Sequence, residues 1–328
     1  MPTRRTLLAA AATFAPSLDG RAQPGGDRPI RLVVPFPAGG ATDAVARLLA
    51  PARSAALGGQ TVVVENRAGG GGIPAADHAA KAAPDGHTLL VATSSIHSTQ
   101  PAVNPGTLPF DPERDFTPLG LIAVSPSLVL VSASAVPART LPEFVAWAKA
   151  RPGAVNYGSS GVGTIPHLNA ALFDALAGTG MVHVPYRGTG PVYAELRRGD
   201  VHLVMDVPST AAPHLQAGAV RALAQTGSGP TPLAPGVPTL AEAGLPGGGF
   251  ASETWFGLFG PAGLPAPVAA RLAAALREAL ADPALRERFL AIGAEVRAEG
   301  PEALAMMASE ERARWVEAIR RHGIRAAE

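Results

Sequence analysis

A short apolar strand that ends in a glycine turn and continues as a helix is the feature that most constrains this fold. Residues 30–34, IRLVV, have the length and the β-branched composition of a buried strand. The prolines of the PFPAGG segment at 35–40 end the strand, and its glycines can adopt backbone angles that other residues avoid. From about residue 42 apolar positions recur with helical spacing. This unit predicts a strand in a sheet with a helix packed on one face.

The start of the predicted helix is a candidate binding site. Thr42 or Asp43 is expected to cap the helix, whose first N–H groups have no partner within the helix. These N–H groups and the helix dipole favour an anion without any cationic side chain. The candidate contacts on this turn are Phe36, Ala38, Gly39, Gly40, Thr42 and Asp43.

The same pattern recurs along the first third of the chain. Strands are predicted at 61–64 and 88–92, with a helix at 75–83 between them. Alternating strands and helices predict mainly parallel sheets flanked by helices, in which ligands bind beyond the carboxyl ends of the strands. Thr93 and Ser94 follow the third strand, so they are further candidate contacts.

A second set of such units follows, so the sequence predicts two α/β lobes. Capping boxes at 140–143 and 239–242 indicate helix starts, and a strand at 155–157 runs into the loop GSSGVGT at 158–164. That loop carries hydroxyl and N–H groups at a helix start, which makes it the second candidate ligand loop; the alternative is a tight turn with ordinary capping. Its candidate contacts are Ser159, Ser160, Gly161, Gly163 and Thr164.

Three further residues are candidate ligand contacts, each with an alternative role. Tyr186 lies in a glycine-rich loop after a strand, and His167 is explained equally well as a packing or capping residue. Asp206 could accept a hydrogen bond from a ligand hydroxyl or amine, or it could anchor a loop. An exported serine hydrolase with Ser160, His167 and Asp206 as its triad is the alternative function. A G-x-S-x-G motif, however, would require glycine in place of Val162.

No nucleotide, metal or other cofactor site is predicted. Gly70, Gly72 and Ala75 fit a dinucleotide fingerprint by spacing, but no acidic residue follows the next strand. The glycine run is better explained as a turn that lets one backbone segment approach another. The eight histidines show no spacing typical of a zinc site.

Residues 1–22 predict export. An arginine pair at 4–5 precedes an apolar run too short to span a bilayer, and a small-x-small cleavage site follows. The arginine pair is compatible with the twin-arginine route. Removing this segment takes away three of 27 basic and one of 26 acidic residues, and the remaining 24 and 25 give no electrostatic case for binding nucleic acid or an anionic membrane. With no cysteine in the chain, the hydrophobic core alone must stabilise the exported protein.

Eight motifs in one fixed order give the chain a specific resemblance. They are PFPAGGATD at 35–43, ENRAGGGG at 65–72, PDGHTLL at 84–90, YGSSGVGT at 157–164, VPYRGTGP at 184–191, VRALAQTG at 220–227, VPTLAEAG at 237–244 and WFGLFGPAGLP at 255–265. Together they resemble the substrate-binding proteins of tripartite tricarboxylate transporters, also called the Bug family. The resemblance extends from about residue 28 to the C-terminus.

This resemblance implies a non-enzymatic, periplasmic-binding-protein-like fold of type II whose two lobes close around a small carboxylate. The first lobe would comprise residues 28–125 and 251–328 and the second 126–250, with two strands crossing between them. The carboxylate-gripping loop would fall at 36–43 and its partner in the second lobe at 159–164. Such a protein is expected to be a monomer that delivers an organic acid to membrane permease subunits. The alternative partner for the same ligand site is a sensor kinase.

Overall fold

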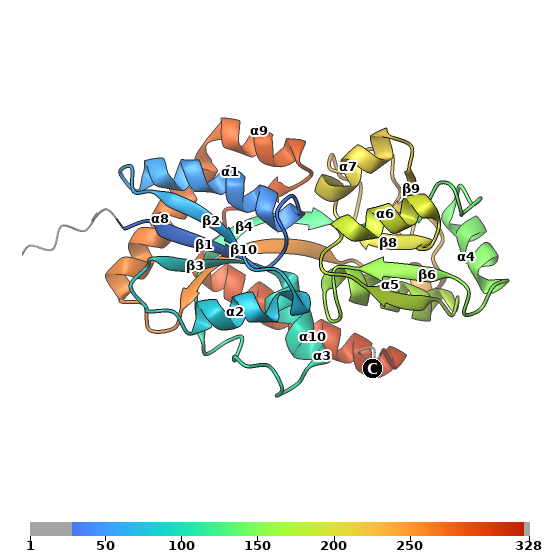
Figure 1. Cartoon of the computed structure of the whole chain (residues 1–328), viewed down its shortest axis with the longest axis horizontal. Helices are drawn as coiled ribbons and strands as arrows, with labels where there is room; N and C mark the ends of the chain where they lie inside the picture. The colour runs from blue at the N-terminus through green and yellow to red at the C-terminus, as the bar shows by residue number, and fades with distance from the viewer. Residues whose placement is uncertain (1–27, 325–328) are drawn as a thin grey trace, which may run out of the picture.

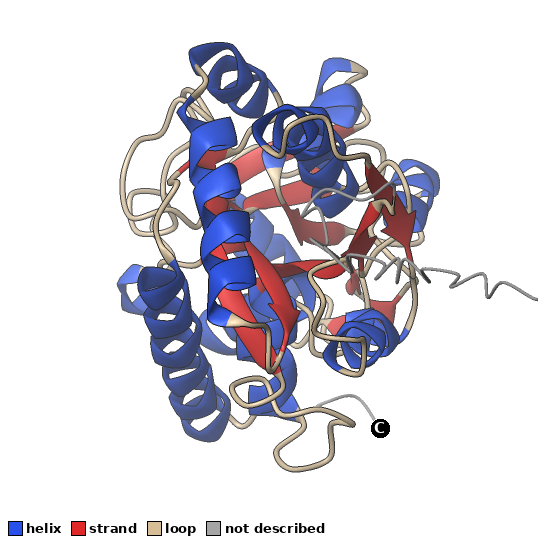
Figure 2. Ribbon diagram, turned by 90° about the vertical axis from the view of Figure 1, so that its left-hand side faces the viewer, coloured by secondary structure: helices blue, strands red, loops and turns tan. Residues whose placement is uncertain are grey.

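The computed structural model describes residues 28–324, which form two α/β lobes side by side (Figure 1). Each lobe is built on one twisted sheet with helices on both faces (Figure 2). The two-lobed α/β architecture predicted from the sequence is therefore confirmed. The predicted export signal at 1–22 lies outside the described residues. None of the described helices is both long enough and apolar enough to cross a membrane.

The first lobe contains a six-stranded sheet in the order β11-β4-β10-β3-β1-β2. The central strand β1 pairs in parallel with β2 and β3, whereas β10 runs antiparallel to both β3 and β4. The short strand β11 adds an antiparallel edge beside β4. The strands are β1 (Ile30–Val34), β2 (Val62–Asn66), β3 (Thr88–Thr93), β4 (Phe116–Pro126), β10 (Glu253–Pro261) and β11 (Glu295–Val296).

The second lobe contains a five-stranded sheet in the order β7-β6-β8-β5-β9. Here β6 pairs in parallel with β7 and β8, while β5 runs antiparallel to β8 and β9. The strands are β5 (Leu128–Ser132), β6 (Asn156–Ser159), β7 (Val182–Pro185), β8 (Leu203–Asp206) and β9 (Val220–Gln225).

Both sheets are therefore mixed, but most strands of each sheet run in one direction, as predicted; of the described strands, β10 and β11 in the first sheet and β5 in the second are reversed. The reason is the path of the chain between the lobes. The chain leaves the first lobe along β4 into β5 and returns after β9 along β10, so the outgoing and returning strands run in opposite directions (Figure 1). Their antiparallel pairing in the first sheet and the reversed direction of β5 in the second follow from this crossing.

The helices cover the sheets on both faces. In the first lobe α1, α8 and α9 pack on one face, and α2 and α10 pack on the other. In the second lobe α4 and α5 cover one face and α6 and α7 the opposite one. The helices are α1 (Ala41–Ala56), α2 (Ile73–Ala80), α3 (Gln100–Val103), α4 (Leu141–Lys149), α5 (Ile165–Ala177), α6 (Gly190–Arg198), α7 (Pro208–Gln216), α8 (Ala266–Ala281), α9 (Pro283–Ala291) and α10 (Pro301–His322), with shorter helical turns η1 (Gly70–Gly72), η2 (Ser95–Thr99) and η3 (Pro246–Gly248).

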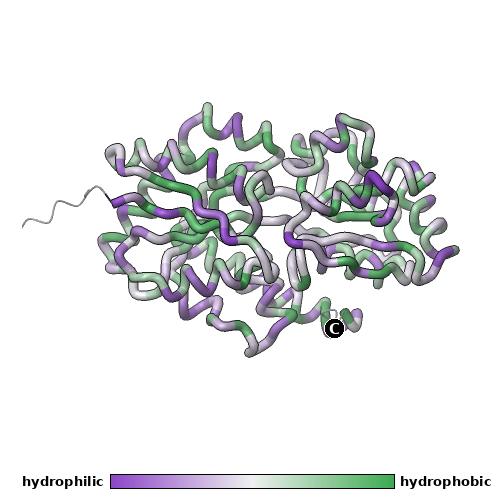
Figure 3. Tube along the Cα trace, in the orientation of Figure 1, coloured by the Kyte–Doolittle hydropathy of each residue, from purple (hydrophilic) through white to green (hydrophobic). Residues whose placement is uncertain are grey.

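Burial on both faces explains why the strands are apolar along most of their length (Figure 3). Leu32 packs in the core beneath α1, and its neighbour Val33 packs in the opposite core beneath α2 and α10. Both side chains are fully buried. A strand covered on both faces has no solvent side, so its sequence shows a continuous hydrophobic run instead of alternation.

The two predicted capping boxes have different outcomes. Thr140 accepts the N–H of Glu143 at the start of α4, as expected. At 239–242 both bonds of a capping box form, since the Glu242 carboxylate accepts the N–H of Thr239 and the Thr239 hydroxyl accepts that of Glu242. No helix follows there, because the chain instead turns back and pairs Thr239 with Gln225. A capping box can thus close an isolated turn.

Candidate functional site

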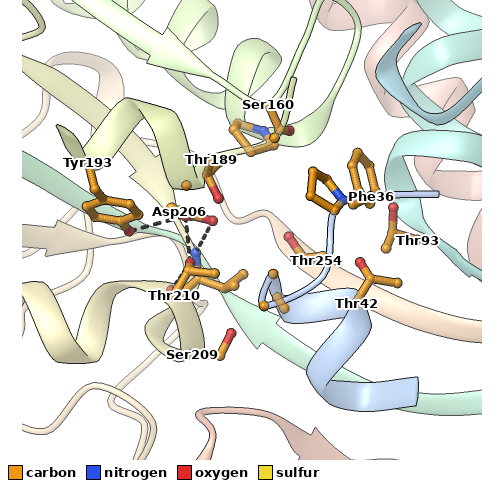
Figure 4. Close-up of a pocket in the computed structure, with 18 of the residues that line it drawn as sticks. Phe36, Thr42, Thr93, Ser160, Thr189, Tyr193, Asp206, Ser209, Thr210 and Thr254 are labelled. Atoms are coloured by element: carbon orange, nitrogen blue, oxygen red, sulfur yellow. Dashed lines mark hydrogen bonds between the residues drawn. The ribbon is translucent and has the colours of Figure 1, made fainter. Parts of the chain in front are cut away.

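A cavity of about 380 Å³ lies between the two lobes. The first lobe contributes the β1–α1 loop, the end of β3 with Ser95 after it, and two residues of β10; the second lobe contributes Ser160, the starts of α5, α6 and α7, and Asp206 (Figure 4). No lysine or arginine is among the lining residues. Any anion held here must therefore be bound by dipoles and N–H groups.

The β1–α1 loop turns sharply into the helix. Gly39 has φ +83°, a conformation that favours glycine, and the N–H of Gly40 bonds to the carbonyl of Pro37 at 3.3 Å. The residue that caps α1 is Gly40, which makes no side-chain bond. The prediction that Thr42 or Asp43 caps the helix is therefore wrong, because the glycine turn places both residues inside the first helical turn.

Asp43 instead fastens this loop from behind. Its carboxylate accepts the N–H of Gly39 at 2.9 Å, the Arg47 guanidinium at 2.9 Å and the Asn66 amide at 3.0 Å. Burial opposes ionisation of Asp43, but the hydrogen bonds from Arg47, Gly39 and Asn66 outweigh it and lower its pKa. The same Asn66 amide also donates to the carbonyl of Phe36 at 3.0 Å. The loop is thus held in one shape before any ligand arrives.

The first turn of α1 has unused donors that face the cavity. Ala41 and Thr42 both line it, and within residues 28–324 neither N–H donates to another protein atom. Because the helix dipole adds positive potential at the same point, a carboxylate is the group best suited to this position.

Two helix starts in the second lobe, those of α6 and α7, form the part of the cavity wall that carries further free N–H groups. The segment 188–191 at the start of α6 and residues 207–210 at the start of α7 both line the cavity. In the described part of the chain, the N–H groups of Gly190 and Ser209 have no protein acceptor. Gly188 has φ +97° and sits so close to Pro37 that an added Cβ would lie 2.9 Å from that ring. The two lobes therefore touch beside the cavity.

Asp206 is the one acidic residue among the described residues that line the cavity. Its carboxylate accepts bonds from the N–H of Val207 at 2.9 Å, the Tyr193 hydroxyl at 3.1 Å and the Thr210 hydroxyl at 2.5 Å (Figure 4). Burial raises the pKa of Asp206, although hydrogen bonds from Thr210, Thr189, Val207 and Tyr193 oppose the shift. The donors fix the direction in which this carboxyl group faces.

Several N–H groups of the loop at 159–164 bond to neighbouring protein groups. The N–H of Gly161 bonds to the Ser159 hydroxyl, that of Gly163 to Nδ1 of His167, and that of Thr164 to the carbonyl of Gly161. In this structure these three N–H groups are bonded within the protein, and contact between this loop and a ligand stays a prediction. Only Ser160 of this loop lines the cavity.

Instead, the loop joins the two lobes. The Thr99 hydroxyl donates to the carbonyl of Gly163 at 2.6 Å, the Gln100 amide to that of Val162 at 2.8 Å, and the N–H of Ile165 to the Ser95 hydroxyl at 3.0 Å. Glycines make the approach possible, since a Cβ at Gly161 would lie 3.3 Å from the Cα of Gly71. We call this contact the latch, formed by Gly71, Ser95, Thr99 and Gln100 of the first lobe and by Gly161, Val162, Gly163 and Ile165 of the second.

The glycine run at 69–72 thus behaves as the sequence predicts, as a turn that brings two backbone segments together. Gly71 has φ +63°, and a Cβ there would lie 2.9 Å from the carbonyl oxygen of Val162. This close contact, rather than nucleotide binding, explains the glycine-rich motif.

The structure does not assemble the alternative serine hydrolase triad. The Ser160 hydroxyl donates to Thr164, Nδ1 of His167 accepts the N–H of Gly163, and Asp206 bonds only to groups of its own cavity wall. A different serine, Ser159, lies 2.7 Å from Nε2 of His183, but its side chain is completely buried.

The stacked histidines behind the latch should make stability depend on pH. The rings of His167 and His183 lie 4.0 Å apart, and burial lowers the pKa of His167 to about 3 and that of His183 to about 4. Below pH 6.5 these histidines bind protons in the unfolded chain but stay neutral in the folded one. The free energy of unfolding therefore decreases as the pH is lowered. His167→Gln, whose amide oxygen can still accept the N–H of Gly163, should remove about 2 kcal/mol of the loss between pH 7 and pH 5.

Urea unfolding of the wild type and of the His167→Gln variant at both pH values measures this difference. The remaining histidines and carboxylates titrate in both proteins, so they cancel in the comparison. An equal loss of stability in the two proteins would contradict a role for His167.

The sixteen predicted contacts divide between the cavity and its supports. Those that line the cavity are Phe36, Ala38, Gly39, Gly40, Thr42, Thr93, Ser160 and Asp206. Those that do not are Asp43 behind the loop, Ser94 buried after β3, Ser159, Gly161, Gly163, Thr164 and His167 in or behind the latch, and Tyr186 in a groove beside it. Sequence reasoning missed Gly188, Thr189, Gly190, Tyr193, Ser209, Thr210, His214, Thr254 and Phe256. The GTG at 188–190, another glycine loop after a strand, was a signal that could have found the second wall.

Comparison with protein families gives one match over most of the chain. The family described as "Tripartite tricarboxylate transporter family receptor" matches residues 45–324. The chain is 39% identical over 325 residues to the UPF0065 protein in the tcbD-tcbE intergenic region of Pseudomonas sp. (strain P51), covering 96% of this chain and 94% of that protein. It is 35% identical over 296 residues to BugT of Bordetella pertussis, covering 90% of each.

Solved structures show the same similarity in three dimensions. MatC from Rhodopseudomonas palustris with bound malate matches with a TM-score of 0.83 and 37% identity over 89% of this chain and 99% of that one. R. palustris Rpa4515 with adipate matches with a TM-score of 0.86 and 35% identity over 91% and 98%. The expected periplasmic-binding-protein-like fold of type II is confirmed.

Proposed function

Because this chain belongs to the tripartite tricarboxylate transporter receptor family, which includes the Bug proteins, we propose that it is a periplasmic solute-binding protein for a small organic acid. Two relatives of known structure hold malate and adipate, both of which carry carboxylates. The ligand of this chain binds in the cavity between the lobes, and no chemical step is performed on it.

One observation supports this proposal above all. The N–H groups of Ala41 and Thr42 are unpaired in the described structure and border a cavity that no lysine or arginine lines. Each hydrogen bond to a charged group contributes about 1.5–3 kcal/mol, and micromolar affinity requires about 8 kcal/mol. Four to six such donors from both lobes therefore suffice after the costs of ordering the complex.

Closure of the lobes brings those donors together. We assign residues 28–125 and 251–328 to the first lobe and 126–250 to the second, and the crossings between β4 and β5 and between β9 and β10 serve as the hinge. The latch then seals one side of the cleft once the lobes meet. Neither lobe alone presents both walls of the cavity.

Export and delivery complete the proposed function. The segment 1–22 directs the chain to the periplasm, and the closed, loaded monomer docks on the membrane permease subunits of a tripartite tricarboxylate transporter. Capture by this protein would then raise the local concentration of the acid at the permease.

A ligand screen tests the proposal directly. Monocarboxylates, dicarboxylates and amino acids of four to six carbons should include at least one compound that raises the melting temperature by a few degrees at millimolar concentration. The matched control replaces the carboxylate of each active acid by a carboxamide, which should not stabilise the protein. Absence of stabilisation by any acid, or equal stabilisation by acid and amide, would contradict anion binding at the start of α1.

A further inference from the structure

We propose that Asp206 selects the far end of the ligand, so that the cleft prefers a monocarboxylate ending in a hydroxyl or ammonium group over a dicarboxylate. This inference rests on the proposed function, because it requires one ligand carboxylate to be held at the start of α1. It assigns a substrate class to the site and a specificity-determining role to one residue.

Asp206 and the unpaired donors of α1 lie on opposite sides of one cavity (Figure 4). Asp206 ends β8 in the second lobe, and the unpaired donors of α1 belong to the first lobe, yet all of them border the same cavity. Figure 4 shows Asp206, Tyr193 and Thr210 on one side of the pocket and Phe36, Thr42 and Thr93 on the other. A ligand gripped by α1 therefore extends toward Asp206.

The described lining of the cavity supplies no positive charge to Asp206. Within residues 28–324 no lysine or arginine borders the cavity, so none of them gives the carboxyl group of Asp206 a cationic partner there. His214 also lines the cavity and stacks on Tyr193 at 4.0 Å, but burial and Arg197 lower its pKa, so it supplies no positive charge at pH 7. The other titratable neighbour, Tyr193, has its pKa raised by burial and by Asp206, so it stays a neutral donor.

These surroundings determine which ligand end group suits Asp206. A second ligand carboxylate beside Asp206 would either place two like charges in a closed cleft or require Asp206 to take up a proton. Burial favours that proton, but the hydrogen bonds from Val207, Tyr193 and Thr210 oppose it, so a dicarboxylate is disfavoured. An ammonium or hydroxyl group at that point would donate to the carboxylate and supply the missing partner. The Thr189 hydroxyl, which points toward Asp206 in Figure 4, can rotate to bond the same ligand group.

The bonds within the wall favour this role over a purely structural one. Val207, Tyr193 and Thr210 donate to Asp206 from different sides and keep its carboxyl group in one orientation. An ionised carboxylate has about four acceptor positions, which these three donors and the Thr189 hydroxyl fill, so a ligand donor binds Asp206 by taking the position of Thr189. Ser209 and Thr210 add hydroxyls to this end of the cavity, which suits a polar ligand end better than an alkyl one.

A matched ligand series tests the inference. The probes are adipate, 6-hydroxyhexanoate, 6-aminohexanoate and hexanoate, with succinate, 4-hydroxybutanoate, 4-aminobutanoate and butanoate as the shorter set. Within a set only the far end of the molecule changes. Titration calorimetry on the wild type should show the hydroxy or amino acid binding about tenfold more tightly than the dicarboxylate of the same length. Asp206→Asn should reverse that order by weakening the amino acid and strengthening the dicarboxylate.

The controls separate failure of this inference from failure of the proposed function. Asp174→Asn changes a hydrogen-bonded carboxylate in α5 outside the cavity and should keep the wild-type order. Asp206→Ser removes the same charge and replaces Asp206→Asn if that variant does not fold. If none of the eight acids binds and no other acid does, the proposed function fails. If the acids bind but adipate or succinate binds most tightly to the wild type, or if both Asp206 variants keep the wild-type order, Asp206 does not select the ligand.

Discussion

Replacing Gly71 by valine should weaken ligand binding about a hundredfold or more, the equivalent of losing the hydrogen bonds of one lobe to a charged ligand. Gly71 has φ +63°, and a Cβ there would lie 2.1 Å from the Gln100 amide nitrogen and 2.9 Å from the carbonyl oxygen of Val162. Gln100 would have to move and would lose its bond to Val162, so the latch could not form. The lobes would remain folded but could not close over the ligand.

Gly69→Val is the matched control for this variant. Gly69 lies in the same loop with φ +121°, so valine is strained there too, but nothing lies within 4 Å of an added Cβ. The two variants share the cost of backbone strain and differ in the clash across the latch. Calorimetry gives the affinities, and small-angle scattering of the ligand-saturated proteins reports closure. Similar affinities and similar compactness in the two variants would show that the latch is not needed for binding.

Local features of this fold could be predicted from the sequence because their causes are local. The apolar run at 30–34 and the glycine turn after it determine β1 and the entry into α1, wherever they sit in the molecule. The same reasoning located the helix predicted at 75–83, which the structure has as α2, and the turn at 69–72. These features depend on steric limits and hydrophobic periodicity within a few residues.

The second wall of the cavity could not be predicted with the same success. The loops at 158–164 and at 188–190 both follow strands, both contain glycines and hydroxyls, and both precede helices. In the loop at 158–164 the N–H groups of Gly161 and Gly163 bond to Ser159 and His167. In the loop at 188–190 the N–H of Gly190 has no acceptor among the described residues and borders the cavity. Which of the two loops presents free N–H groups to the cavity depends on which one lies opposite α1, and the fold of the whole chain determines that.

The roles of Asp43 and Asp206 illustrate the same limit. Both carboxylates accept hydrogen bonds near a helix start, so the sequence alone gives each the choice of ligand contact or anchor. In the structure, Asp43 turns behind the loop toward Arg47 and Asn66, while Asp206 borders the cavity. Asn66 ends β2 and reaches Asp43 only because β2 pairs in parallel with β1. Long-range pairing therefore decides what a local motif cannot.

Ala41→Pro should weaken binding by about ten- to a hundredfold while leaving α1 intact, which tests the main-chain grip directly. Proline at the first helical position deletes one N–H donor and costs the helix nothing, because that N–H has no partner in the helix. The backbone already suits the change, since Gly40 has φ −80° and ψ 170°, a conformation that a residue before proline adopts readily. The expected loss equals one hydrogen bond to a charged group.

Ala41→Val separates the missing donor from the added bulk. Valine resembles proline in volume and also borders the cavity, but it keeps the N–H group. We expect the valine variant to bind the most stabilising acid of the screen nearly as well as the wild type, and the proline variant to bind it far less tightly at an unchanged melting temperature. If the two variants bind the acid equally well, the N–H of Ala41 does not hold the carboxylate. In that case the anion site lies at another wall of the cavity, where the N–H groups of Gly190 and Ser209 are the remaining candidates.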